Sequence, residues 1–76
     1  MSRPAKHSLT LGGHRTSVTL EDEFWQAFRE IAEAEGKGLN ALAAEIDAAR
    51  GTASAGVTAG LATAIRLYVL AYYRKR

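Results

Sequence analysis

Residues 8–20 read Ser-Leu-Thr-Leu-Gly-Gly-His-Arg-Thr-Ser-Val-Thr-Leu and contain two short runs in which polar and apolar residues alternate. Alternation with a period of two is typical of a β-strand with one face in the core. The apolar positions are odd-numbered before the two glycines and even-numbered after them. Because this parity changes at Gly12-Gly13, the glycines indicate either a turn or a bulge, and both alternatives stay open.

The residues after this strand region indicate a first helix over 21–35. Acidic residues occupy its opening turn, where negative charge suits the positive end of a helix. Thr19 and Asp22 have the spacing of a capping box, which predicts that the Thr19 hydroxyl caps the helix. Gly36 stands where a residue in the left-handed conformation would end it.

Two more helices are expected over 39–50 and 61–73, joined by a loop over 51–60 that is rich in glycine and alanine. Apolar residues in 39–50 recur at i, i+3, i+4 and i+7, the spacing of an amphipathic helix. The helix over 61–73 is apolar on most sides, and one of its stripes consists of Leu67, Leu70 and Tyr73. One small core cannot cover every side, so this helix indicates a subunit interface.

The composition is that of one small domain. A chain of 76 residues buries a limited share of its surface, and such chains usually depend on disulfides, a metal or a partner chain. The sequence has no cysteine and two histidines, which leaves a partner chain as the expected stabiliser and fits the cytoplasm. No stretch has the pattern of a signal peptide or a membrane span.

Charge is unevenly distributed along the chain. All eight acidic residues lie between Glu21 and Asp47. In residues 1–20 and 48–76, the charged residues are all Lys or Arg. With a pI near 9.3, this layout favours a polyanionic partner. The alternative is that short basic tails serve only solubility. Residues 1–7, which contain a proline and scattered positive charge, are expected to form a flexible basic arm, and residues 8–76 a single domain.

The order of these parts resembles the ribbon-helix-helix repressors. The likeness lies in Arg-Thr-Ser-Val-Thr-Leu at 15–20, Glu-Asp-Glu-Phe-Trp at 21–25 and Glu-Gly-Lys-Gly-Leu-Asn at 35–40. Together with the Tyr-Tyr-Arg ending of the last helix, these stretches look like a compact bacterial branch of that family. The resemblance implies a mostly α fold with a short β-ribbon and an extra C-terminal helix. It also implies an intertwined homodimer whose ribbon, built from two chains, enters the major groove of double-stranded DNA.

The resemblance assigns base contacts to Arg15, Ser17 and Thr19, which point outward if the even-numbered apolar residues of their strand point into the core. Arginine can donate two hydrogen bonds to guanine, and hydroxyl groups can donate or accept. The alternative makes Arg15 a solvated charge and the other two ordinary strand residues. Thr19 ranks third, because its hydroxyl is also expected to cap a helix.

The resemblance also assigns phosphate contacts to the start of the second helix, at Gly38, Leu39 and Asn40. Free backbone amides and the helix dipole hold anions at such a position. Gly38 departs from the family, which usually has Ser or Thr there. For Asn40 the alternative is ordinary helix-start chemistry. Lys37 and His14 are further candidates for backbone contacts, with plain solvent exposure as the alternative for each.

Other functions find little support in the sequence. The two histidines lack metal-ligand spacing, no residue pattern indicates an activated nucleophile, and neither a cofactor nor a metal is expected. The protein is therefore predicted to be a repressor-like DNA-binding regulator and not an enzyme. One alternative is an antitoxin-like or adaptor protein that binds a partner through 61–73. Another is a binder of a small anionic nucleotide on the ribbon. Further assembly of dimers on DNA is left open.

Overall fold

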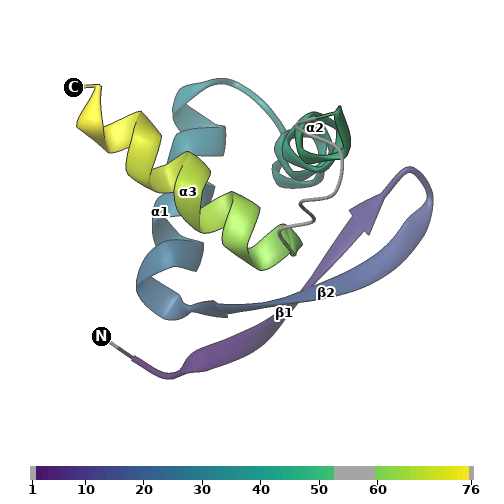
Figure 1. The fold of residues 1–76 in the computed structure, drawn as a ribbon, viewed down its shortest axis with the longest axis horizontal. Helices are drawn as coiled ribbons and strands as arrows, with labels where there is room; N and C mark the ends of the chain where they lie inside the picture. Colours follow the sequence, from purple (N-terminus) through teal and green to yellow (C-terminus); the bar gives the residue numbers. More distant parts are fainter. Residues whose placement is uncertain (1, 53–59, 76) are drawn as a thin grey trace.

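The computed structural model describes residues 2–52 and 60–75. For residues 50–52 it describes the backbone alone. The chain forms a two-stranded sheet followed by three helices (Figure 1). The elements in chain order are β1 (Pro4–Leu11), β2 (His14–Glu21), α1 (Asp22–Ala34), α2 (Leu39–Thr52) and α3 (Leu61–Arg74). The ribbon runs along one side of the molecule and the helices lie together on its other side (Figure 1).

The two strands form an antiparallel hairpin. Leu11 pairs with His14 at the turn, and Pro4 pairs with Glu21 at the open end. Gly12 and Gly13 form the two-residue connection with φ angles of 57° and 84°. A two-residue hairpin loop of this kind requires positive φ at both positions, which glycine adopts without steric cost. The open choice between turn and bulge is therefore resolved as a turn.

Both strands of the ribbon belong to one chain. The resemblance implied a ribbon made by two copies, but β1 here occupies one edge of β2 over all eight residues of the strand. The reason is the glycine pair, which lets the chain reverse within two residues. Pairing with a second copy stays a prediction and would involve the other edge of β2.

The prediction of a flexible arm over 1–7 is wrong for residues 4–7, because β1 begins at Pro4. The alternation of the strand extends to Ala5 and His7, whose side chains are half-buried. The His7 ring stacks on Trp25 of α1, with ring centroids 4.2 Å apart and planes 8° from parallel. His7 therefore occupies a core-facing position as a flat aromatic ring, although its sequence context is that of a polar arm.

The prediction of a capping box at the start of α1 is also wrong. The N-cap is Glu21, which makes no side-chain cap bond, and Thr19 lies within β2. The Asp22 amide instead donates to Oγ of Ser2 over 3.2 Å, and that hydroxyl donates to Oε1 of Glu23 over 2.6 Å. The helix start is therefore satisfied by a residue brought there by β1, and the Thr19 hydroxyl is left for other contacts.

The end of α1 follows the expectation. Gly36 has a φ of 69°, its amide donates to Glu33 O, and the Lys37 amide donates to Ala32 O. This pair of bonds is a Schellman motif, in which a left-handed residue lets the last carbonyls of a helix be satisfied. It turns the chain directly into α2, so that the start of α2 is held at the β1 side of the ribbon.

One apolar core joins the ribbon to all three helices. Its largest fully buried side chains come from every element of the fold: Leu9, Leu20, Phe28, Ile31, Leu42 and Ile65. In contrast, Leu67, Leu70 and Tyr73 of α3 are 58%, 50% and 43% exposed. The single chain thus covers one side of α3 and leaves the stripe expected at an interface in contact with solvent.

The loop expected over 51–60 lies mostly outside the described residues. Residues 51 and 52 belong to the end of α2, residues 53–59 are not described, and Gly60 is the N-cap of α3. Across 2–52 and 60–75, none of the helices combines the length and the apolar character needed to cross a membrane.

Candidate nucleic-acid interface

The ribbon has one apolar and one polar face. Alternate side chains, including the buried Leu9, Val18 and Leu20, face the helices. The intervening side chains face away from the core, because successive residues of a strand point to opposite sides. We name these exposed residues the polar ribbon face: Lys6, Ser8, Thr10, Arg15, Ser17 and Thr19.

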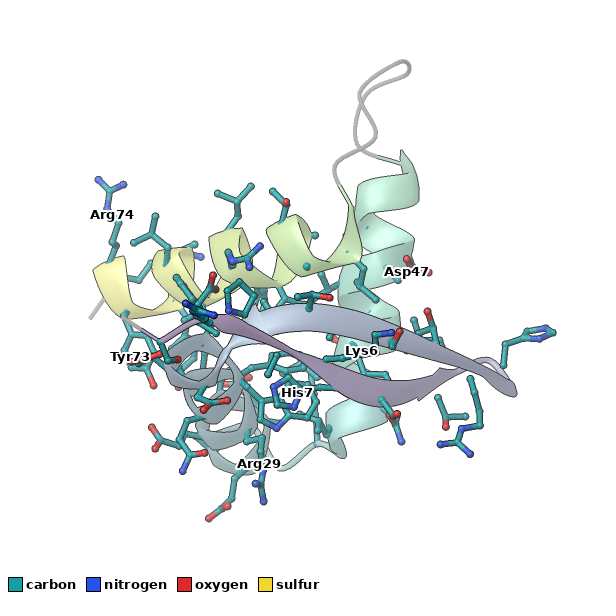
Figure 2. The ribbon with its side chains drawn as sticks, turned by 90° about the horizontal axis from the view of Figure 1, so that it is seen from below. Lys6, His7, Arg29, Asp47, Tyr73 and Arg74 are labelled. Carbon is teal, nitrogen blue, oxygen red and sulfur yellow. The ribbon has the colours of Figure 1, made fainter. Side chains whose placement is uncertain are left out.

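The polar ribbon face forms a continuous array. Three cross-strand pairs build it: Lys6 with Thr19, Ser8 with Ser17, and Thr10 with Arg15. Side chains directly opposite each other in such pairs have Cβ atoms about 4.5–5.5 Å apart. The face therefore combines two cations with four hydroxyl groups, and Lys6 lies on the ribbon itself (Figure 2). None of its members is acidic.

The three residues predicted to contact bases, Arg15, Ser17 and Thr19, share this face and are exposed. The sequence reasoning missed the matching row on β1. Its signal was present as the alternation of Ala5, His7 and Leu9 with polar residues, but the histidine and the proline made that stretch look like an arm.

Glu21 is the acidic residue closest along β2 to the polar ribbon face, and Arg66 of α3 neutralises it. The Arg66 Nε lies 2.9 Å from Glu21 Oε1, and its Nη2 donates to the Thr19 carbonyl oxygen over 3.2 Å. The guanidinium also lies 5.9 Å from the centre of the Phe24 ring. The hydrogen bond from Arg66 lowers the pKa of Glu21 below its ordinary value. Arg66 thus fixes α3 to the base of β2 and removes the repulsion that a free carboxylate would exert on an anion.

This ion pair makes a testable contribution to stability. A carboxyl whose pKa is lowered by folding stabilises the native state above its unfolded pKa, and that contribution is lost as the pH falls through the folded value. We therefore expect the melting temperature of Glu21→Gln to lie below that of wild type at neutral pH. The gap should close as the pH falls below about 4.5. Thermal unfolding followed by circular dichroism measures it, with the exposed Glu30→Gln as the matched control. A gap that is independent of pH would contradict this role of Glu21.

The start of α2 lies against the outer edge of β1. Oδ1 of Asn40 accepts a hydrogen bond from the Thr10 amide over 2.9 Å. The first bond of the helix runs from the Leu42 amide to Gly38 O, so the preceding amides, including those of Leu39 and Asn40, have no partner within the helix. The structure therefore brings the predicted phosphate-binding turn next to the polar ribbon face.

The two remaining candidates, Lys37 and His14, are placed differently. Nζ of Lys37 lies 2.9 Å from Glu45 Oε1, and this hydrogen bond raises the pKa of the lysine. Lys37 thus has a carboxylate partner nearly two helical turns into α2. His14 is exposed beside the turn of the hairpin, at the opposite end of the ribbon from the ion pair of Arg66.

Comparison with known families identifies this arrangement. A family model described as the ribbon-helix-helix domain matches residues 4–73. The chain belongs to the ribbon-helix-helix domain family. The match begins with β1 and ends in α3, so it spans both strands and the first two helices of this ribbon-helix-helix domain and all of α3 but its last residue. The predicted fold class is confirmed: a two-stranded antiparallel ribbon followed by helices, with an extra C-terminal helix.

Membership carries a general functional meaning. Ribbon-helix-helix domains are commonly DNA-binding regulators or antitoxins and are typically not enzymes. Searches of the curated proteins and of the solved structures found no match to the chain. In the described part of this ribbon-helix-helix domain, histidine and acidic residues do not gather into a group that could hold a metal ion.

Proposed function

We propose that this ribbon-helix-helix domain is a sequence-specific, repressor-like DNA-binding regulator whose polar ribbon face enters the major groove. The observation that carries the proposal is the face itself, which combines two cations with four hydroxyl groups. Glu21, the acidic residue at the end of β2 on the same side of the ribbon, is paired with Arg66. The major groove of B-form DNA is about 12 Å wide and admits a ribbon of this kind. Arginine and hydroxyl side chains are among those that read base edges there.

Within this proposal the residues have separate roles. Arg15 donates to guanine O6 and N7, and Ser17 and Thr19 contact neighbouring base edges. The free amides at Leu39 and Asn40 hold a phosphate, which fixes the position of the ribbon without reading sequence. The adjacency of Asn40 to Thr10 supports this division, because it puts the helix start beside the face that reads bases.

The proposal includes a homodimer, and two features support it. The two-residue turn makes Leu11 and His14 a hydrogen-bonded pair, so the backbone groups of Arg15 and Ser17 point to the outer edge of β2. In the described part of the chain these groups have no partner, and unpaired strand edges readily join another strand. The exposed Leu67 and Leu70 on α3 add apolar surface that a second copy would cover.

The cysteine-free sequence suits the reducing cytoplasm of a bacterium.

The experiment is selection of fragments from genomic DNA, followed by gel retardation of the selected duplex over a range of salt concentrations. A dimer that neutralises about four phosphates should lose about 10²-fold in affinity between roughly 50 mM and 200 mM salt. Sedimentation of the purified chain with and without the duplex gives its stoichiometry. A failure to select any sequence, or an affinity independent of salt, would refute DNA reading, and a monomer in both states would refute the dimer.

A second candidate rests on the exposed stripe of α3. Leu67, Leu70 and Tyr73 form an apolar surface that the chain itself does not cover. An antitoxin-like or adaptor protein would use such a surface to bind a partner protein. In that case, substitutions in the stripe would remove partner binding, and the selection experiment would enrich no DNA sequence.

A further inference from the structure

We propose that β1 contacts DNA together with β2, so that each chain supplies both strands of a DNA-reading ribbon. The residues concerned are Lys6, Ser8 and Thr10. This inference rests on the proposed function and extends the contact surface beyond the three residues of β2.

The pairing within the hairpin supports this role of β1. Lys6, Ser8 and Thr10 lie opposite Thr19, Ser17 and Arg15 on one exposed face. Neighbouring strands of a sheet are about 4.8 Å apart, which is less than half of the roughly 12 Å width of the major groove. The hairpin of one chain therefore fits within the groove. In a dimer joined at the outer edges of the two β2 strands, the two β1 strands would lie three spacings, roughly 14 Å, apart, so each β1 row would face a wall of the same groove.

The position of α2 also places β1 at the DNA. Its start is bound to the outer edge of β1, through the Thr10 amide and Asn40 Oδ1, and not to the edge of β2. The order across the surface is therefore the start of α2, then β1, then β2. If the amides at the start of α2 hold a phosphate on the wall of the groove, β1 lies closer to that wall than β2 does. β1 cannot then lie outside the footprint on DNA.

The side chains of the β1 row have the chemistry that DNA contacts require. Thr10 is next to the helix start, and Lys6 is at the far end of the strand, so the row places a hydroxyl group near one phosphate and an ammonium group about four residues along the ribbon. An ammonium group serves as a point charge for phosphate, and hydroxyl groups serve either phosphate or base edges. Lys6 should thus act mainly on affinity and salt dependence, and Ser8 and Thr10 on sequence choice.

The test compares Lys6→Gln with Lys75→Gln, which removes the same charge at the exposed end of α3. We expect Lys6→Gln to weaken binding to the selected duplex by about tenfold at low salt and to reduce the salt slope by about one per chain. Lys75→Gln should have less than a threefold effect. Equal effects of the two variants would overturn the proposal, because they would reflect net charge alone.

A second pair of variants tests base reading by β1. Ser8→Ala combined with Thr10→Val should reduce the ratio of specific to non-specific affinity by about tenfold or more, with the melting temperature as a check on folding. The same assay on Arg15→Ala separates the two hypotheses. If Arg15→Ala loses specific binding and the β1 variants bind as wild type, the role of β1 is refuted and the proposed function stands. If Arg15→Ala also binds as wild type, both are refuted.

Discussion

Arg15→Ala is expected to abolish sequence-specific retention of the selected duplex and to leave the fold intact. Arg15 is exposed on β2 and is not part of the apolar core, so its removal leaves the core unchanged. One bidentate contact to guanine is worth about 1–3 kcal/mol of discrimination, and a dimer makes it twice. The specific affinity should therefore fall by about 30-fold to about 10⁴-fold.

Gel retardation with the selected duplex and with an unrelated duplex measures this effect. Arg29→Ala is the matched control, because it removes the same charge from α1, on a side of the molecule away from the labelled Lys6 (Figure 2). Arg15→Lys is a sharper variant, since it keeps the charge and loses the planar pair of donors. If Arg15→Ala binds both duplexes as tightly as wild type while it remains folded, Arg15 does not read bases.

Leu42→Ala is expected to remove a large part of the protein's free energy of unfolding. Leu42 is 1% exposed and packs in the core that joins α2 to β1 and α3. A buried leucine replaced by alanine typically costs about 2–5 kcal/mol. Natural domains have a total stability of about 5–15 kcal/mol, and a chain this short belongs at the low end of that range. The loss is thus comparable with the whole free energy of unfolding.

Leu67→Ala makes the same chemical change within a helix, at a side chain that is 58% exposed. At a low protein concentration its free energy of unfolding should differ from wild type by less than about 0.5 kcal/mol. Urea unfolding of both variants, followed by circular dichroism, makes the comparison. If the two variants lost similar amounts of their free energy of unfolding at low protein concentration, the assignment of Leu42 to the core and of Leu67 to the surface would be wrong.

The sequence supported those parts of the fold that depend on short-range patterns. Alternation around Val18 and Leu20 identified the buried face of β2, and Gly36 identified the end of α1 because only local geometry decides a Schellman motif. The row at Arg15, Ser17 and Thr19 followed from the same alternation. These features are set by residues within about one turn or one strand of each other.

The features that the sequence missed depend on contacts between distant residues. Ser2 caps a helix that begins twenty residues later, and Arg66 binds Glu21 across forty-five residues. His7 joins the core because the fold brings Trp25 beneath its ring. No local pattern distinguishes these residues from solvated ones, so the first half of β1, residues 4–7, was mistaken for part of an arm, and the share of β1 in the polar ribbon face was overlooked.

Under the proposed function, the bond between Asn40 and Thr10 has a consequence for the shape of the nucleic acid that this domain would accept. It connects the polar ribbon face to the start of α2 before any encounter. Less motion then has to be lost on association, which lowers its entropic cost. Such a pre-formed surface would also select for helical form: an A-form duplex, with its deep and narrow major groove, would not admit the hairpin and the turn together.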